Sequence, residues 1–153
     1  MPWGRADAGK QALYHRPDPV RVLTVVAGLL VDGDGHVLIT QRPQGKAMAG
    51  LWEFPGGKLE VGESPEAALA RELYEELGLT VRPDDLKPFT FASHRYEEFH
   101  LLMPLFVCRT WDGTPIPREV ADIRFVPPDR LTDFAMPEAD APLVEHIQTA
   151  FRE

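Results

Sequence analysis

The sequence predicts one layered domain of the α/β or α+β class, and three observations lead to this prediction. Short apolar runs rich in β-branched residues are separated by turn signals, which is typical of strands. Two other segments have helical periodicity and capping residues. The 153 residues, 44% of them hydrophobic, are enough for one core and too few for two ordinary domains. Strands and helices that interleave in one such domain pack as layers.

The first two strands are predicted on either side of a tight turn. Residues 22–31 form an apolar run, residues 36–40 form a second, and Asp32-Gly33-Asp34-Gly35 lies between them. This is a hairpin signature, which predicts two adjacent strands. Residues 50–54 predict a short strand that ends at Pro55-Gly56-Gly57, where the chain is expected to turn. Further strands are predicted at residues 89–93, 100–109 and 123–126.

A helix is predicted over residues 65–77, because both of its ends carry recognisable signals. Ser64 is a good N-cap, Pro65 suits the first helical position, and Gly78 suits the C-terminal stop. Leucines recur every four residues along this segment and predict a buried stripe. They are Leu69, Leu73 and Leu77.

The two ends of the chain have different predictions. A final helix is predicted over about residues 141–152, with Asp140 as a candidate cap. Residues 1–19 mix Gly, Pro and charge without hydrophobic periodicity, which predicts a flexible N-terminal arm without a catalytic role. The folded domain is therefore expected to cover residues 20–153.

The composition excludes several classes of function. A net charge of −8 and a pI near 5.1 argue against binding along a nucleic-acid polymer, since such polymers are held mainly by clustered Lys and Arg. A small anionic substrate remains compatible if a metal cation offsets the repulsion. The single cysteine, Cys108, forms no internal disulfide, and no signal peptide or apolar run of about 18 residues is present. These features predict a soluble cytoplasmic protein without a membrane partner, and they carry no signal for an oligomeric state.

Three glutamates fall on one face of the predicted helix at residues 65–77. Glu72, Glu75 and Glu76 are spaced i, i+3 and i+4, which places their carboxylates within a few ångströms of each other. The ordinary interpretation of such a cluster is a solvated acidic face.

Neighbouring residues favour a cation site over a solvated face. Gly56 and Gly57 allow backbone carbonyls to approach a cation, and Glu63 adds a fourth carboxylate before the helix. Arg71 can pair with Glu75 on the same face. Hard oxygen ligands in this number suit Mg²⁺ or Mn²⁺ together with substrate phosphates. The sequence therefore predicts a metal site for phosphate chemistry.

The segment from Gly57 to Leu79 matches the Nudix pattern G-x5-E-x7-R-E-U-x-E-E-x-G-U, in which U is aliphatic, at every fixed position. A match of this length at fixed spacing is a specific signal, and the chain resembles the Nudix family on it. The resemblance implies a mixed β-sheet sandwiched between helices, with the motif as a loop-helix-loop. It also implies attack of a metal-positioned water on a diphosphate linkage. The fixed positions are Gly57, Glu63, Arg71, Glu72, Leu73, Glu75, Glu76, Gly78 and Leu79.

Beyond the motif, residues 21–147 can be laid along the MutT-type branch of this family. This resemblance implies hydrolysis of a nucleoside triphosphate at the β-phosphorus to a monophosphate and pyrophosphate. An 8-oxo-dGTP diphosphatase that sanitises the nucleotide pool is the first interpretation. A pyrophosphatase for CTP, a modified dCTP or several nucleotides is the second. A non-catalytic Nudix-fold binding module is the third, and the complete set of motif glutamates counts against it.

The resemblance also implies roles at the metal site. The Gly56 carbonyl, Glu72 and Glu76 correspond to the main metal ligands, and Glu75 to a ligand of a further metal or of its water. Arg71 corresponds to a residue that orients the carboxylates by charge-assisted hydrogen bonds.

A more distant glutamate is matched less fully. Glu119 falls where MutT-like proteins place a glutamate that joins the metal site or activates water. Relatives usually continue Glu-Gly-Gln, whereas this chain continues with Val120 and Ala121. An ordinary loop carboxylate is the alternative, and spacing does not identify which glutamate is the general base.

Two residues match positions that border the nucleotide in MutT-like proteins, and a third is a candidate contact of a phosphate. Arg42 follows the second predicted strand, and Phe54 precedes the glycine turn. Lys58 lies beside the glycines and can meet a phosphate. The alternatives are a core role for Phe54, which alternates as half-buried strand residues do, and an exposed surface role for Lys58.

Asp140 matches the position of the base-reading side chain in the C-terminal segment of MutT-like proteins. Some of those proteins have Asn there, which can meet both the 6-oxo group and the N7–H of oxidised guanine. An ionised Asp only accepts, so it favours bases that present donors, unless burial raises its pKa and keeps it protonated. A helix N-cap is the alternative role for Asp140.

Overall fold

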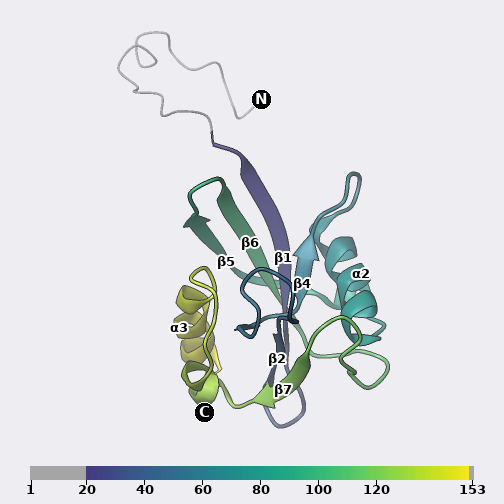
Figure 1. Cartoon of the computed structure of the whole chain (residues 1–153). Coiled ribbons are helices and arrows are strands. Elements are labelled where there is room, and N and C mark those ends of the chain that lie inside the picture. The colour runs from purple at the N-terminus through teal and green to yellow at the C-terminus, as the bar shows by residue number, and fades with distance from the viewer. Residues whose placement is uncertain (1–19, 152–153) are drawn as a thin grey trace, which may run out of the picture.

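Two β-sheets lie between the helices α2 (Pro65–Leu77) and α3 (Ala141–Ala150) in the computed structural model, which describes residues 20–151 (Figure 1). The predicted arm, residues 1–19, lies outside the described residues. Two short 3-10 helices, η1 (Pro83–Asp85) and η2 (Pro128–Asp133), were not predicted. The predicted mixed α and β fold class is confirmed. The strands are β1 (Val22–Leu30), β2 (Val37–Gln41), β3 (Trp52–Glu53), β4 (Gly56–Lys58), β5 (Lys87–Arg95), β6 (His100–Cys108) and β7 (Asp122–Val126).

The strands divide into two sheets. The larger sheet has the order β4-β1-β6-β5 and is mixed, since β1 and β6 are parallel and the other pairs are antiparallel. The smaller sheet has the order β3-β2-β7 and is antiparallel. The resemblance implied one mixed sheet, and the structure instead places β2 in a second sheet.

The predicted hairpin of β1 and β2 is therefore wrong beyond its turn. The turn forms, because the Asp32 carboxylate accepts the backbone N–H groups of Asp34 and His36, both at 2.9 Å. After one bridge between Val31 and Val37 the two strands separate. β1 pairs with β6 on one edge and with β4 at Val25–Ala27 on the other, whereas β2 pairs with β3 and β7, so β2 does not join the sheet of β1.

Two apolar layers follow from the alternation along β1. Val26 and Leu30 face α2, whereas Ala27 and Leu29 face α3, as successive strand residues point to opposite faces. The predicted leucine stripe of α2 is confirmed, since all three leucines are fully buried in the first of these layers. Within residues 20–151, no helix combines the length and apolar composition that crossing a bilayer requires.

The ends of α2 agree with their predicted signals. The Ser64 hydroxyl accepts the Ala67 N–H at 3.1 Å, and Gly78 has a left-handed φ of 71°.

Residues 56–58 differ from their prediction, because they form β4 on β1 and are not only a turn. Asp140 occupies the predicted N-cap position of α3, but its side chain does not act as a cap. Asp140 precedes α3 with helical angles of φ −83° and ψ −27°, whereas a capping side chain needs extended ones, and its side chain makes no cap hydrogen bond.

Candidate active site

The glycines of β4 lie where no side chain fits. A Cβ atom on Gly57 would stand 2.5 and 2.7 Å from the carboxylate oxygens of Glu72. A Cβ atom on Gly56 would collide with the Val26 carbonyl and stand 2.8 Å from the Ala27 Cα. The backbone of β4 therefore approaches the α2 glutamates directly on one side and β1 on the other.

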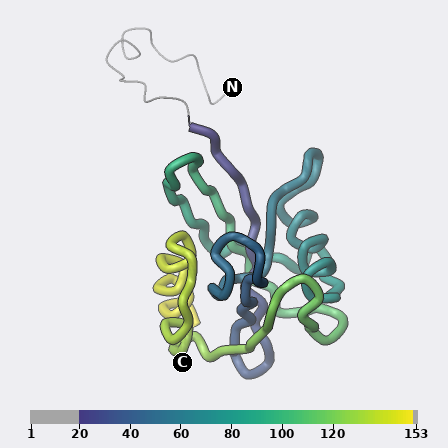
Figure 2. Tube along the Cα trace, viewed as in Figure 1, coloured from purple at the N-terminus to yellow at the C-terminus, as the bar shows by residue number. Residues whose placement is uncertain are grey.

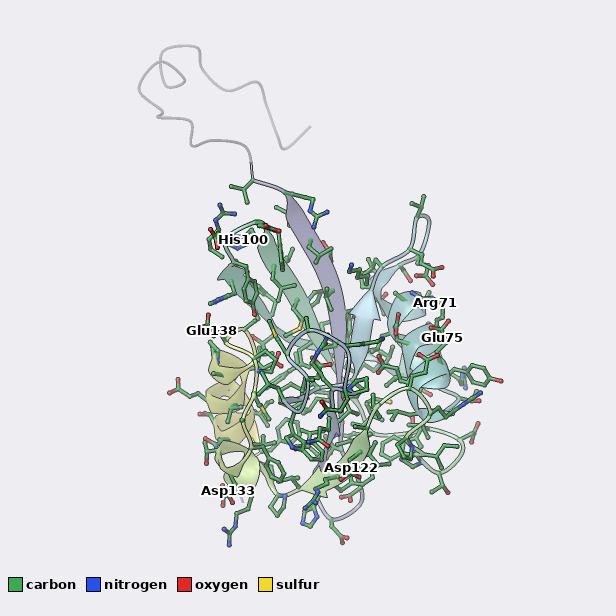
Figure 3. The ribbon with its side chains drawn as sticks, viewed as in Figure 1. Arg71, Glu75, His100, Asp122, Asp133 and Glu138 are labelled. Carbon is green, nitrogen blue, oxygen red and sulfur yellow. The ribbon has the colours of Figure 1, made fainter. Side chains whose placement is uncertain are left out.

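Arg71 connects the carboxylates of the motif (Figure 3). Its guanidinium donates to both oxygens of Glu63, at 2.7 and 2.9 Å, and to Glu72 at 3.0 Å. The predicted pair with Glu75 is present at 3.4 Å, and a further N–H donates to the Lys58 carbonyl at 3.1 Å. Hydrogen bonds from Arg71 hold the pKa of Glu63 at about 2, far below its usual value. Arg71 therefore joins the loop before α2, the helix itself and β4.

Glu76 is placed differently from the other two helix glutamates. Burial raises the pKa of Glu76 to about 8, and the nearby carboxylates of Glu72 and Glu53 add to this rise. Burial also raises the pKa of Glu72 despite its bond to Arg71, and Glu119 contributes to the rise at both residues. Two partly buried carboxylates and the distant Glu119 thus lie within electrostatic reach of one another.

A cavity of about 520 Å³ brings most of the predicted site residues together. Arg71, Glu63 and Gly78 are not among its lining residues. Lys46, which sequence reasoning missed, also lines it and comes from an exposed loop without any distinguishing pattern. The predicted residues that line the cavity are Arg42, Phe54, Gly56, Gly57, Lys58, Glu72, Glu75, Glu76, Glu119 and Asp140.

The lining residues fit a divalent cation. Carboxylates and a backbone carbonyl are the oxygen donors that such ions take in phosphate sites. A carboxylate whose pKa is raised by burial and by like charges, as at Glu76, gains free energy from a cation beside it. Among the described residues, no three His, Cys, Asp or Glu side chains already converge in ligand geometry. Glu72 and Glu75 are hydrogen-bonded to Arg71 instead.

A second cavity of about 230 Å³ adjoins the first and shares Val25, Arg42, Glu53, Met103 and Asp140 with it. Its walls are mainly apolar and aromatic, and they come from β1, from the β5–β6 hairpin and from the loop before α3. Such a pocket with a few polar groups at one end is the usual form of a small-molecule site. The larger apolar and aromatic lining residues include Leu23, Val25, Tyr96, Phe99, Leu101 and Met103.

Asp140 stands where the two cavities meet. It is only 4% exposed, and burial raises its pKa to about 8, with a further rise from the Glu53 carboxylate. Asp140 therefore meets the condition stated above for this position. Burial raises its pKa, so its carboxyl group can keep a proton and both donate and accept hydrogen bonds.

Glu53 is the main site residue that sequence reasoning missed. Its carboxylate accepts the Arg42 guanidinium at 3.0 and 3.2 Å, while Arg42 also donates to the Ala47 carbonyl at 2.7 Å. Burial raises the pKa of Glu53 in spite of this arginine. The available signal was a charged residue between Trp52 and Phe54 in a half-buried strand, directly before the glycine turn.

The positions of Phe54 and Lys58 are compatible with both of the roles considered for each residue. Phe54 is 4% exposed and belongs to the apolar layer against α3, which agrees with the core interpretation, and it also lines the larger cavity. Lys58 is exposed at the edge of that cavity, so its ammonium group is free to reach a phosphate there.

This combination of fold and site corresponds to a known family. A NUDIX domain family model matches residues 26–146, so the chain belongs to this family and is a Nudix hydrolase. An 8-oxo-dGTP diphosphatase of Proteus vulgaris is 42% identical over 89 residues, which are 58% of this chain and 78% of the relative. A CTP pyrophosphohydrolase of Escherichia coli K12 is 35% identical over 128 residues, or 82% of this chain and 91% of the relative.

A solved structure agrees with this assignment. MutT, from a study of Aliivibrio salmonicida and Vibrio cholerae, superimposes with a TM-score of 0.73 at 34% identity. The superposition covers 85% of this chain and 99% of that one. The predicted family, fold and enzyme class are confirmed by these comparisons.

Proposed function

We propose that this Nudix hydrolase cleaves nucleoside triphosphates to monophosphate and pyrophosphate with Mg²⁺, that 8-oxo-dGTP is its preferred substrate, and that it acts on the cytoplasmic nucleotide pool. The observation that carries the proposal is the placement of one buried Asp140 at the junction of an apolar pocket with a cavity lined by glutamates. The pocket takes the base, and the glutamate cavity takes the phosphates.

At the phosphate end, the Gly56 carbonyl, Glu72 and Glu76 hold the cation, and Glu75 and Glu119 complete the site. Mg²⁺ neutralises phosphate charge and lowers the pKa of a bound water, and Mn²⁺ accepts the same oxygen donors. A carboxylate of the cluster accepts the proton of the attacking water.

The surrounding residues position these groups. The hydrogen bonds of Arg71 to Glu72 and Glu75 fix the orientation of both carboxylates before substrate arrives. Lys58, at the cavity edge, meets a phosphate oxygen of the substrate.

At the base end, Asp140 reads the oxidised purine. Because its pKa is about 8, the carboxyl group is protonated at neutral pH and offers one donor and one acceptor. The O6 and N7–H groups of 8-oxoguanine need this pair, whereas N7 of guanine is only an acceptor. Arg42 borders the nucleotide where the cavities meet and is held there by Glu53, and Phe54 closes the neighbouring wall. The relative named 8-oxo-dGTP diphosphatase supports this choice of substrate.

A second candidate substrate is CTP or a modified dCTP. An ionised Asp140 accepts hydrogen bonds and therefore favours the amino group of cytosine. The relative named CTP pyrophosphohydrolase spans most of the chain and supports this candidate.

The test compares pyrophosphate release from 8-oxo-dGTP, dGTP, dCTP and CTP at low concentration with Mg²⁺, with Mn²⁺ and with a chelator. We expect kcat/KM to be at least about tenfold higher for 8-oxo-dGTP than for dGTP, as one added hydrogen-bonding group allows. A preference for cytosine nucleotides would select the second candidate. Tight nucleotide binding without release from any substrate would replace both with a non-catalytic binding module.

A further inference from the structure

The loop between β6 and β7, residues 109–121, runs past the C-terminal end of α2 (Figure 2). We refer to it as the β6–β7 loop. At its start, Thr80 and Asp112 exchange backbone hydrogen bonds of 3.0 and 2.9 Å. Further along, the Ile116 N–H donates to the Leu77 carbonyl at 3.0 Å. The loop is therefore tied to the end of α2 before it reaches Glu119.

The attachment is strongest at Arg118. Its backbone N–H donates to the Glu76 carbonyl at 3.0 Å, and its guanidinium donates to the Tyr74 carbonyl at 3.3 Å. The same guanidinium lies 5.4 Å from the centre of the Tyr74 ring, which is a cation–π distance. The N–H of Glu119 also donates to the Glu76 carbonyl, at 3.3 Å.

These contacts bring hydrogen-bond donors and a positive charge to the C-terminal end of α2. The last carbonyls of a helix have no partner within the helix, and a cation near them is stabilising. α2 has no basic residue in its last turn, where Glu75 and Glu76 lie instead. Arg118 therefore supplies from a distant loop the positive charge that the last turn of α2 lacks and a backbone donor for the Glu76 carbonyl. Its guanidinium adds a second donor to the Tyr74 carbonyl, which also accepts the Gly78 N–H.

Gly78 fits the same arrangement. A Cβ atom at this position would stand 3.4 Å from the Arg118 Cδ and 3.6 Å from the Ile116 Cγ1. The loop thus packs closely over the helix end at the residue that closes the motif.

We propose that Arg118 is a positioning residue, which holds the β6–β7 loop on α2 so that Glu119 faces Glu72, Glu75 and Glu76. We refer to these three residues as the glutamate cluster. Glu119 is exposed, lies outside any helix or strand, and lines the same cavity as Glu72 and Glu76. Its position therefore depends on its anchors. The adjacent anchor, Arg118, reaches α2 through its backbone N–H, which donates to the Glu76 carbonyl, and through its guanidinium, which contacts the Tyr74 carbonyl and ring. A substitution of Arg118 removes only the contacts of the guanidinium. This inference rests on the proposed membership of Glu119 in the metal site.

The test uses the full chain and the variants Arg118→Ala, Arg118→Lys, Glu119→Gln and the double variant Arg118→Ala/Glu119→Gln. Amide hydrogen exchange is followed in metal-free protein, Mn²⁺ binding by calorimetry, and kcat/KM on the best nucleotide. Arg109→Ala is the matched control, because Arg109 belongs to the same loop and lies 5.3 Å from the ring of Phe151, away from the cluster.

In Arg118→Ala we expect about tenfold faster exchange of the Arg118 and Glu119 amides, with the amides in the first half of α2 unchanged. We also expect about tenfold weaker Mn²⁺ binding and about tenfold lower kcat/KM. Arg118→Lys restores most of each loss, and Arg109→Ala behaves as the parent protein. In the Glu119→Gln background, Arg118→Ala has no further effect on Mn²⁺ binding.

Unchanged exchange of the Arg118 and Glu119 amides in Arg118→Ala would overturn the inference. So would additive losses of Mn²⁺ affinity in the double variant, because Arg118 would then act independently of Glu119. If Arg118→Ala does not fold, Tyr74→Leu removes only the ring, and the same exchange and binding results then decide. Normal Mn²⁺ affinity in Glu119→Gln would remove Glu119 from the proposed site and with it the inference. Absence of nucleotide turnover in the parent protein would count against the proposed function only, since exchange and Mn²⁺ binding still decide this inference.

Discussion

The two ends of the site differ in how the chain builds them. The glutamate end is local, because its proposed cation ligands, apart from Glu119, come from β4 and α2 within residues 56–76. The base pocket joins Leu23 on β1 to Asp140 before α3, which are far apart in the sequence. The glutamate end gathers several carboxylates at one cavity, whereas the base pocket contains one almost fully buried carboxyl group, that of Asp140. Under the proposed function, the reaction chemistry thus depends mainly on one short segment, whereas base selection depends on the whole fold.

Removal of one ligand charge should affect the glutamate end most. We expect Glu76→Gln to lower kcat by about a thousandfold or more, because the amide neither neutralises a cation nor accepts a proton. Circular dichroism should show an intact fold, and the affinity for the nucleoside monophosphate should change little. Unchanged turnover in this variant would remove Glu76 from the metal ligands.

The close approach of β4 to α2 should be the next most sensitive feature. In Gly57→Ala the added methyl group meets the Glu72 carboxylate, so we expect kcat/KM to fall by about a hundredfold. Gly33→Ala is the control, since a Cβ atom there has no neighbour within 4 Å. Kinetics of both variants on one substrate measure the effect, and an equal loss in both would show that space at Gly57 is not the cause.

The base pocket should respond in selectivity rather than in rate. The preference of the parent protein for 8-oxo-dGTP over dGTP should fall as the pH rises through about 8, because Asp140 then loses its donor proton. In Asp140→Asn, whose amide offers a donor and an acceptor at every pH, the ratio of the two kcat/KM values should stay constant with pH, so that at pH 9 it exceeds the ratio of the parent protein by about tenfold. The ratio is measured between pH 6.5 and 9, so that titration of groups shared by both reactions cancels. An equal rate loss on every base would argue against base reading by Asp140.

The last expected effect concerns stability and not catalysis. The folded protein binds a proton at Asp140 more tightly than the unfolded chain does, since the pKa rises from 3.8 to about 8. The stability that this proton provides is complete below about pH 4 and is lost as the pH rises to about 8. Metal-free Asp140→Asn should therefore gain stability relative to the parent protein over this range, by up to about 1 kcal/mol per pH unit. Chemical denaturation of both proteins at pH 5, 6.5 and 8 measures the difference, and a constant difference would contradict the burial effect.

The local features of the fold were predictable because their causes are local. Ser64, Pro65 and Gly78 delimit α2 through contacts within a few residues, and the helical spacing alone gathers the three glutamates. The strands β2, β6 and β7 also agree closely with their predicted ranges, since their apolar patterns are continuous. β5 is longer than predicted, because its exposed ends pair with β6 and have no apolar pattern of their own.

Sequence by itself thus determined the class of chemistry: a loop, a helix and the carboxylates that a cation needs. Only the tertiary structure decided which strands pair, because β1 pairs on both edges with strands distant in sequence and leaves β2 to a second sheet. It also decided that Glu53 meets Arg42, and that Asp140 is buried where the two cavities meet and makes no capping hydrogen bond with its side chain. Burial and pKa depend on what the rest of the chain places around a side chain, and a linear pattern does not contain that information.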